Sequence, residues 1–564
     1  MFSLKRILKQ EHAPLFLLLC SWGAYLVLLF ARIIGFKDDG LYVGHENVWS
    51  DWALHIGMAN IFALKEPSQW FAYHPMYAGG KFTYPFVTNL IPGLLMRLGL
   101  DLPSAMKLSS ILYAIGCLCG FYFLCRRLLN SGWQAFLAIS IFLLSSGLGF
   151  FDFVRHASQS FSWDLIAYPP KDYTRIEGYS WLAGNVLVAI LVPQRAGLLG
   201  MTVSSWALFL FLRGFDLLKA RPRSAKRRFL SSAILLGALP VIHVHSLIAI
   251  APGLVLACLG NLRFWRAWLW CAVPAGALAL MLYLKFISGG IANSNFMKIF
   301  WGWTVKGGFL DWMAMWLRIW GLMAPVALVG LVFYFKNQPS RHSRLLILGL
   351  FLTFALANII LFQPTDWDNS KLFFWSYFGF SVVAASMLAR GFSHPHWGLK
   401  SSSVIVLLCL TLTGVLEVYR LARVERHTFR LSDDADIRLS KEIREKTRPT
   451  DVFLTATIHN HPIMMWAVRP VLMGYPGWVN NYGFDYQQRA REIESIFRGA
   501  PDTERLLSLH QIKYVAIGPS ELREFRADEA YFRCRYGLAF QNANFRIYEI
   551  GQKLDPSVCS QAAQ

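Results

Sequence analysis

Long apolar stretches recur from residue 14 to residue 421, and short polar or basic segments separate them. A run of about 18 to 20 apolar residues can cross the roughly 30 Å hydrocarbon core of a bilayer as a helix. After residue 421 the pattern changes to short alternating and amphipathic segments. The sequence therefore predicts a polytopic α-helical membrane domain over residues 1–421 and a C-terminal extracytoplasmic α/β domain over residues 422–564.

The apolar stretches predict about eleven transmembrane helices. We expect them near residues 14–36, 105–125, 133–150, 196–217, 229–242, 246–260, 268–286, 310–334, 345–362, 372–390 and 402–421. Residues 86–99 are apolar but too short to cross, so a re-entrant or interfacial helix is expected there. The apolar run over residues 229–260 is interrupted at PVIHVHS, which predicts two short helices that meet near the outer surface.

The 564 residues are 55% hydrophobic and 16% charged, and the formal net charge is +21 at pH 7. The basic residues gather in short loops, for example Lys5, Arg6 and Lys9 before the first span and KARPRSAKRR at 219–228. Such clusters mark the cytoplasmic ends of spans, which predicts a cytoplasmic N-terminus and places residues 422–564 outside. We therefore expect a multi-pass protein of the inner (cytoplasmic) membrane, with membrane lipid and not nucleic acid around it.

Residues 422–564 contain two amphipathic helical segments, SKEIREKTR at 440–448 and YQQRAREIESIFRG at 486–499. The segments DVFLTA, KYVAIG and FRIYEI are predicted strands because β-branched and aromatic residues dominate them. Of the nine cysteines, only Cys534 and Cys559 lie outside the apolar stretches, and they could form a disulfide if this region is extracytoplasmic. We expect the segments to form a small domain on the outer face.

Three polar segments fall on the outer side of this predicted topology. They are residues 37–85 within the large first outer loop 37–104, His243 with His245, and QPTDWDNSK at 363–371. Polar groups at membrane depth are costly and usually line a cavity or a site. We therefore expect the three segments to build one outward-facing pocket.

The first outer loop contains VWSDWALHIG, which places Asp51 between two tryptophans and His55 four residues later. Ser50 and Asp51 are both good N-cap residues, so Asp51 could simply start a helix. The functional interpretation is a general base on an interfacial helix whose apolar side, with Trp52 and Ile56, rests on the membrane. His55 would then lie on the same helical face, within reach of Asp51.

The same loop contains HPMYAGGKFTYPF, and its His74, Lys81 and Tyr84 are candidate substrate-binding residues. Asp38 and Asp39 are interpreted differently, as residues that end the first span and start a turn.

Asp366 and Asp368 are two residues apart, and Lys371 follows them. Carboxylates at this spacing can share a divalent cation with a phosphate-containing ligand, or they can pair with Lys371 and other basic groups. Both acids are candidate catalytic residues, a divalent cation is left open, and no other cofactor is indicated.

His243 and His245 are too few for a structural zinc site, so hydrogen bonding in a pocket is favoured over metal binding. Arg195 lies near the outer end of a predicted span. It could snorkel towards water, or it could bind a phosphate through the fork of donors on its guanidinium.

Several segments together resemble the GT-C superfamily of integral-membrane glycosyltransferases. An N-terminal span precedes a large outer loop with an acid at the start of its first helix (SDWALHIGMANIF), and KFTYPFVTNLIPGLL leads into a short apolar helix. The chain is similar to poorly characterised bacterial members related to protein mannosyltransferases and the lipid A aminoarabinose transferase. That likeness lies in PQR at 193–195, HVHS at 243–246, DWDNSK at 366–371 and RPVLMGYPGW at 469–478.

The resemblance implies an inverting transferase that moves a sugar from a polyprenyl-phosphate donor to a lipid, glycan or protein acceptor outside the membrane. The family carries an essential acid in the first outer loop, and the matching position is Asp51, the expected general base. Asp366 or Asp368 would stabilise positive charge on the sugar. The donor phosphate would be held by a set of cationic and imidazole side chains: Arg195, Lys371, His243 and His245.

The aromatic residues at 469–478 would help to bind the acceptor. The alternative function is a transporter or flippase of a lipid-linked saccharide that makes and breaks no bond. The polar segments gather on one side of the membrane and the spans show no two-fold pattern, which favours transfer over transport.

Overall fold

A computed structural model of the chain describes residues 12–175, 184–289, 297–338 and 340–554. The basic residues Lys5, Arg6 and Lys9 and the predicted disulfide partner Cys559 lie outside these ranges. The chain forms two compact units. Unit 1 comprises Met1–Arg32, Ser110–Lys285 and Phe296–His427, and unit 2 comprises Ile33–Ser109, Phe286–Asn295 and Thr428–Gln564. The predicted domain boundary between residues 421 and 422 stays a prediction.

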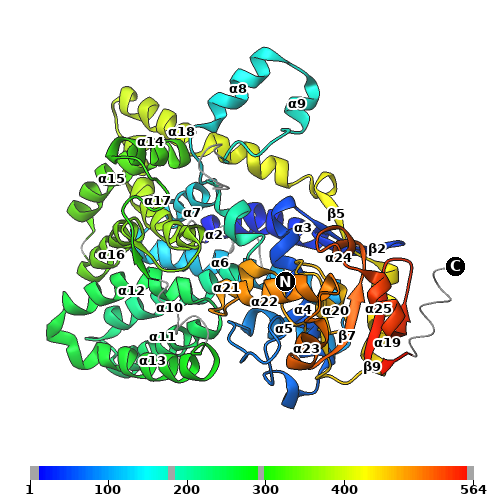
Figure 1. The fold of residues 1–564 in the computed structure, drawn as a ribbon. Coiled ribbons are helices and arrows are strands. Elements are labelled where there is room, and N and C mark those ends of the chain that lie inside the picture. The colour runs from blue at the N-terminus through cyan, green and yellow to red at the C-terminus, as the bar shows by residue number, and fades with distance from the viewer. Residues whose placement is uncertain (1–11, 176–183, 290–296, 339, 555–564) are drawn as a thin grey trace, which may run out of the picture. The chain divides into compact units, whose positions relative to one another are not determined.

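Unit 1 is built almost entirely from apolar helices (Figure 1). Within the described residues, six helical stretches are long and apolar enough to cross a membrane: Ala13–Arg32, Leu102–Leu129, Arg195–Leu217, Leu262–Phe286, Asp366–Ser393 and Trp397–Leu421. A seventh crossing is added if Phe309–Trp320 and Met323–Asn337, which are bent by 85° at their junction, count as one broken span. The predicted total of about eleven spans is not confirmed, whereas a helical membrane protein is.

The described helices of unit 1 run in this order along the chain. They are α2 (Ala13–Leu18), α3 (Ala24–Arg32), α6 (Leu102–Leu129), α7 (Gly132–Leu143), α8 (Gly149–Gln159), α9 (Trp163–Ala167), α10 (Arg195–Leu217), α11 (Pro222–Ala238), α12 (Val244–Leu259), α13 (Trp265–Phe286), α14 (Phe309–Trp320), α15 (Met323–Asn337), α16 (Arg341–Ala357), α17 (Ser370–Ser393) and α18 (Trp397–Leu421). Helix α10 packs against α11, and α12 packs against both α16 and α17 (Figure 1).

The predicted break in the run over residues 229–260 is present. Helix α11 ends at Ala238, a short 3-10 turn covers Leu239–Val241, and α12 begins at Val244. Pro240 lies inside this turn, where the absence of a backbone N–H prevents the α-helical hydrogen bond. The turn leaves His243 at the start of α12.

Unit 2 contains two sheets. Strands β1 (Ile34–Lys37), β2 (Gly40–Gly44) and β5 (Thr428–Asp433) form an antiparallel sheet. Gly40 has a φ of +150°, and a Cβ there would lie 2.1 Å from the Ser432 carbonyl oxygen, so only glycine fits the β1–β2 turn beside β5. The second sheet has the order β6 (Val452–Leu454), β7 (Ile512–Ile517), β9 (Arg546–Lys553), β8 (Tyr536–Gln541), with only β6 and β7 parallel.

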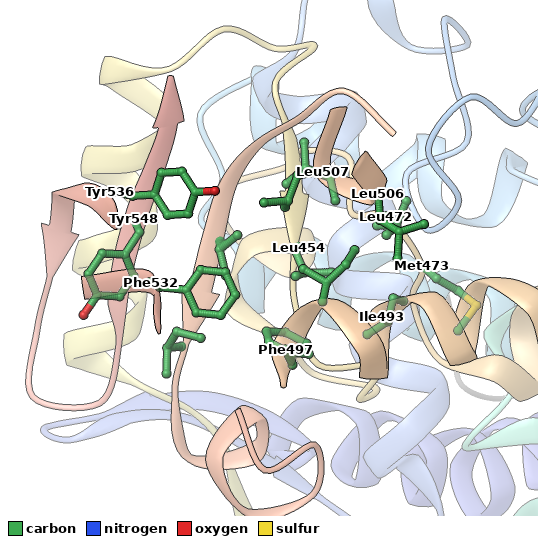
Figure 2. Close-up of a cluster of buried hydrophobic side chains, with 14 of the residues drawn as sticks. Leu454, Leu472, Met473, Ile493, Phe497, Leu506, Leu507, Phe532, Tyr536 and Tyr548 are labelled. Carbon is green, nitrogen blue, oxygen red and sulfur yellow. The ribbon is translucent and has the colours of Figure 1, made fainter. Parts of the chain in front are cut away.

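The helices of unit 2 that follow residue 433 are α19 (Asp434–Lys446), α20 (Pro462–Met465), α21 (Pro476–Asn481), α22 (Gln487–Phe497), α23 (Thr503–Leu509), α24 (Pro519–Arg523) and α25 (Glu529–Arg535). A buried apolar core joins three of them to the second sheet. Figure 2 shows Ile493 and Phe497 from α22, Leu506 and Leu507 from α23, and Phe532 from α25 in this core. The predicted helices and strands of this region are therefore present.

Helices α4 (Trp49–Leu64) and α5 (Val87–Arg97) complete unit 2 and pack against each other. Helix α5 is the short apolar helix predicted over residues 86–99. Trp52 and Ile56 on α4 are fully buried in the protein. The expectation that this side of α4 rests on lipid is therefore wrong, because α5 and α20 pack on the helix.

Candidate active site

The candidate base, Asp51, lies in the first turn of α4 in unit 2. Its side chain is half-buried, whereas the next eleven residues of the helix, through Phe62, are buried. A carboxylate in the first turn is stabilised by the positive end of the helix dipole, which favours the ionised form that a base requires. His55 follows one helical turn later on the same face.

Asn89 on α5 positions His55. The imidazole Nδ1 of His55 lies 2.8 Å from the amide Oδ1 of Asn89, and both residues are buried. An amide oxygen only accepts hydrogen bonds, so Nδ1 carries the proton and donates to it. Asn89 was missed by the sequence reasoning, although a single amide in an apolar helix is a signal that points to it.

His74, Tyr84 and Lys81 also lie in unit 2. His74 is completely buried between aromatic rings, with its ring centroid 5.3 Å from that of Tyr482. Burial lowers the pKa of His74 to about 3, so its imidazole is neutral at pH 7 and brings no charge to a phosphate. Tyr84 packs edge-on against Tyr482 at 5.4 Å, and Lys81 Nζ donates to the Ser288 carbonyl at 3.1 Å. The role of these three residues in substrate binding stays a prediction.

The two candidate histidines of unit 1 lie at the start of α12. Their ring centroids are 5.3 Å apart. His243 Nδ1 lies 2.8 Å from the Ser246 hydroxyl, which also accepts a hydrogen bond from the indole of Trp375 on α17 at 3.1 Å. This chain of contacts joins the first turn of α12 to the second turn of α17.

Arg195 is the first residue of α10 and is completely buried. Its guanidinium lies over the ring of Tyr113 at 5.8 Å, within cation–π range. Two glycines on the following turns let α10 approach the histidine end of α12. A Cβ on Gly200 would lie 2.5 Å from the Cβ of His243, and a Cβ on Gly197 would lie 3.9 Å from its Nε2. Arg195 and His243 therefore start neighbouring helices at the same end.

The QPTDWDNSK segment forms a 3-10 turn, Asp366–Asn369, directly before α17. Lys371 Nζ contacts Asp368 Oδ1 at 2.6 Å, and the two side chains are only 15% and 7% exposed. The buried amide of Asn369 donates to the carbonyls of Ala357 and Ile360 and holds the turn in place. Asp366 is half-buried.

The three helices α10, α12 and α17 thus begin together in unit 1. The side chains of the three N-cap residues, Gln194, His243 and Asn369, make no capping hydrogen bond. Helix N-termini carry partial positive charge and N–H groups that attract anions. Lys371 is also close enough to His243 and His245 to act on both rings electrostatically. The arrangement suits an anionic group such as a phosphate.

The fit to a metal ion is poor. In a 3-10 turn of about three residues per turn, side chains two positions apart point in different directions, so Asp366 and Asp368 do not converge. Asp368 already has Lys371 as its partner. Among the described residues, no group of three or more His, Cys, Asp or Glu side chains is placed to hold a metal.

The predicted site residues therefore form two groups. Unit 1 brings together Arg195, His243, His245, Asp368 and Lys371, with Asp366 two residues from the ion pair. Unit 2 brings together Asp51 and His55, whereas His74 and Tyr84 gather around Tyr482. Two of the three outer polar segments lie together in unit 1; a single pocket from all three stays a prediction.

No model of a protein family matches the chain, and no curated protein matches its sequence. Among solved structures, apo ArnT from Cupriavidus metallidurans is similar over 97% of this chain and 99% of that chain, with 10% identity and a TM-score of 0.50. ArnT of the same organism bound to undecaprenyl phosphate matches 95% of this chain and 97% of its own, with 11% identity and a TM-score of 0.40. An oligosaccharyltransferase from Archaeoglobus fulgidus, tethered to an acceptor peptide, matches 96% and 74%, with 14% identity and a TM-score of 0.45.

The likeness to apo ArnT extends over nearly the whole of both chains. It shows that this chain and ArnT share a fold. Since fold alone does not fix function, the activity has to be argued from the residues of the site.

Proposed function

We propose that the protein is an inverting glycosyltransferase that moves a sugar from a polyprenyl-phosphate donor to an acceptor at the outer face of the inner membrane. The observation that carries the proposal is the joint start of α10, α12 and α17, with Arg195, His243 and Lys371 at these ends. This is an arrangement for a phosphate in a protein with a GT-C fold. The N-terminus is cytoplasmic in this proposal, and residues 422–564 are extracytoplasmic.

The cationic end of unit 1 holds the donor phosphate. Arg195 and Lys371 supply charge, His243 and His245 supply ring N–H groups, and the helix N-termini supply backbone N–H groups. These groups stabilise the negative charge that grows on the phosphate oxygen as its bond to the sugar breaks. Asp368 keeps Lys371 in place through their 2.6 Å contact.

Asp51 is the general base. It takes the proton from the acceptor hydroxyl while that oxygen attacks the anomeric carbon from the face opposite the phosphate. The new bond joins the acceptor oxygen to the anomeric carbon, the carbon–oxygen bond to the phosphate breaks, and polyprenyl phosphate leaves. Attack from the opposite face inverts the anomeric configuration. His55, fixed by Asn89, lies one helical turn from the base.

Asp366 is the candidate for stabilising the positive charge that develops on the sugar ring. It is half-buried, and it precedes the Asp368–Lys371 pair in the same turn. This assignment gives the two acids different roles, because Asp368 is already occupied by Lys371.

The test uses the purified protein in proteoliposomes, undecaprenyl-phosphate hexoses and pentoses labelled in the sugar, and an envelope fraction as the source of acceptors. Asp51→Asn should lower transfer by a factor of about 10² to 10⁴, which is what a general base contributes. Asp38→Asn is the matched control, because Asp38 is an exposed acid in the same outer loop; it should transfer like the wild type. Full transfer by Asp51→Asn would remove the base from the mechanism.

The same assay separates transfer from transport. A flippase would leave the labelled donor intact, whereas a transferase moves the label covalently to an acceptor. The three uncapped helix ends and the buried cations suit the departure of a phosphate, and nothing in the described structure favours transport over transfer.

A further inference from the structure

Four aromatic side chains from three separate segments of unit 2 form an aromatic cluster, which comprises Trp49, His459, Tyr475 and Trp478. His459 stacks on Tyr475 with a centroid distance of 3.7 Å and an interplanar angle of 30°. Trp49 meets the His459 ring at 4.2 Å, and Trp478 meets it edge-on at 5.0 Å. Tyr475 and Trp478 are 5.6 Å apart and nearly perpendicular.

The cluster is distinct from the apolar core of unit 2. That core is built from residues such as Leu454, Ile493 and Phe532, and none of the four cluster residues belongs to it. Trp49 is 48% exposed, His459 and Tyr475 are half-buried, and the fourth ring, that of Trp478, is buried. Aromatic rings that pack only for stability are normally buried. Partly exposed rings held in a fixed arrangement are typical of a binding surface.

The ring of Tyr475 is also fixed by the backbone. Tyr475 is the N-cap of α21, and Gly477 lies directly under its edge. A Cβ on Gly477 would lie 2.5 Å from Tyr475 Cε1, so the ring occupies space that only glycine leaves open. The turn formed by Tyr475, Pro476 and Gly477 therefore helps to set the orientation of the Tyr475 ring in the aromatic cluster.

The chemistry of the cluster suits a neutral ligand with polarised C–H bonds. Burial lowers the pKa of His459 to about 4, so at pH 7 the imidazole is uncharged and serves as one more aromatic surface. The faces of aromatic rings carry partial negative charge. The axial C–H bonds of a pyranose ring carry partial positive charge and present a flat face that matches an aromatic ring. Asn480, two residues after Trp478 in α21, carries an amide that can donate to and accept from sugar hydroxyls.

The position of the cluster relates it to the proposed base. Trp49 and Asp51 are two residues apart in the first turn of α4, so they are within one helical turn of each other. Side chains two residues apart on a helix point to different sides, so the proposal is that a glycan chain with one sugar on Trp49 reaches the Asp51 carboxylate with a neighbouring sugar. The cluster and the proposed base both belong to unit 2, whereas the proposed phosphate-binding groups belong to unit 1, so the proposed function assigns the sugar on the cluster to the acceptor.

We infer that the aromatic cluster binds a pyranose ring of the acceptor, so that the acceptor is a glycan or a glycolipid. The assignment to the acceptor rests on the proposed function, whereas the presence of a saccharide site does not. The hydroxyl that is glycosylated then belongs to a neighbour, in the glycan, of the ring stacked on the cluster.

The test is saturation-transfer NMR on the full-length protein in detergent, with methyl pyranosides of glucose, galactose, mannose and N-acetylglucosamine as probes at millimolar concentration. At least one probe should receive saturation at its ring C–H protons. Trp49→Ala and Tyr475→Ala should each weaken binding about tenfold, because stacking on one ring contributes about that much. Tyr475→Phe keeps the ring and should bind like the wild type. Trp163→Ala, which removes a tryptophan that is 77% exposed on α9, is the matched control.

Two results would overturn the inference. One is that no probe binds, or that both alanine variants bind within twofold of the wild type. The other is a result from tryptophan fluorescence in nanodiscs. If brominated lipids quench the fluorescence of the wild type clearly more than that of Trp49→Phe, then Trp49 contacts lipid and the cluster belongs to the aromatic belt at the membrane interface. Asp51→Asn should still bind the probe. If it binds the probe but the wild type transfers no sugar, the proposed function fails and the saccharide site remains.

Discussion

His55 on α4 donates a hydrogen bond to Asn89 on α5, with 2.8 Å between the imidazole Nδ1 and the amide Oδ1. The contact fixes the ring of His55 and leaves Nε2 as the nitrogen without a proton in the neutral ring. Asp51 lies one turn before His55 on the same helix. The proposed base and the ring that Asn89 fixes therefore share one face of α4.

Replacing Asn89 with leucine should impair both stability and catalysis. The variant leaves a buried imidazole N–H without an acceptor, which costs about 1–3 kcal/mol in the free energy of unfolding. It also frees the ring of His55, so the pH profile of kcat should change as well as its size. Urea unfolding in detergent and transfer rates between pH 5 and pH 9 measure the two effects.

The matched control for this prediction is Asn60→Leu. Asn60 is also a buried amide on α4, and it donates to the Met465 carbonyl at 2.8 Å. Its loss should lower stability similarly and leave the pH profile unchanged. If Asn89→Leu behaves like Asn60→Leu in both measurements, Asn89 has only a structural role.

The buried pair of Asp368 and Lys371 gives a second prediction. Lys371→Met leaves a carboxylate that is only 7% exposed without its cation, and this should lower the free energy of unfolding by about 3–5 kcal/mol. Adding Asp368→Asn should restore most of the stability, because the uncompensated charge is gone. The KM for the donor should stay raised in the double variant, because the phosphate has still lost a cation.

Thermal unfolding and donor KM distinguish these two effects. Lys446→Met is the control, because Lys446 pairs with Glu442 on the surface, with 63% and 44% of the side chains exposed. An exposed pair contributes less than about 1 kcal/mol. A double variant with normal donor KM would exclude Lys371 from phosphate binding.

The sequence predicted those features that depend on local composition. The break at PVIHVHS follows from Pro240, and the short helix α5 follows from a run of apolar residues too brief to cross a membrane. The pattern also predicted that His243 and the Asp366–Lys371 segment share one side of the membrane. In unit 1 the helices that follow them are in contact, because the indole of Trp375 on α17 donates a hydrogen bond to Ser246 on α12.

Features that depend on contacts between distant segments could not be predicted in this way. Helix α4 is apolar around its circumference, and only the structure shows that α5 and α20 cover it. Strand β2 pairs with β5 although most of the helices lie between them along the chain, and periodicity within a strand does not specify its partner. The aromatic cluster could not be predicted for the same reason, because nothing in the sequence around Trp49 or around His459 indicates that the two rings are in contact.

A third prediction concerns the close approach of α10 to His243. Gly200→Ala places a Cβ 2.5 Å from the His243 Cβ and 2.8 Å from its ring, so the histidine or the helix has to move. Overpacking of this kind costs about 1–3 kcal/mol. Because His243 belongs to the proposed phosphate site, the donor KM should rise about tenfold, as for the loss of one hydrogen bond to a charged group.

Gly276→Ala on α13 is the matched control, because a Cβ there meets nothing within 4 Å. Alanine is the better helix former, so this variant should be neutral or more stable by up to about 1 kcal/mol. An unchanged donor KM in Gly200→Ala, together with lower stability, would contradict a role for His243 in donor binding.

The last prediction follows from Lys65, the C-cap of α4, which is only 4% exposed. Burial, together with the nearby charge of Arg469, lowers the pKa of Lys65 from its ordinary 10.5 to about 7. Between these pH values the unfolded chain binds a proton that the folded protein does not. Through Lys65, the free energy of unfolding therefore rises between pH 7 and pH 10.5 by at most about 1.4 kcal/mol per pH unit. This gain in stability is lost as the pH falls towards 7.

Lys65→Met should remove this pH dependence and raise the free energy of unfolding near pH 7, where the wild type bears the cost of a buried ammonium group. The difference between Lys65→Met and the wild type should then shrink as the pH rises from 7 to 9.5, as measured by urea unfolding in detergent at constant ionic strength. The exposed Lys446→Met should follow the wild-type curve throughout. A difference in the free energy of unfolding that stays constant with pH would show that Lys65 keeps its proton in the folded protein. Groups besides the Tyr73 hydroxyl, to which Lys65 donates a hydrogen bond, would then stabilise the ammonium group.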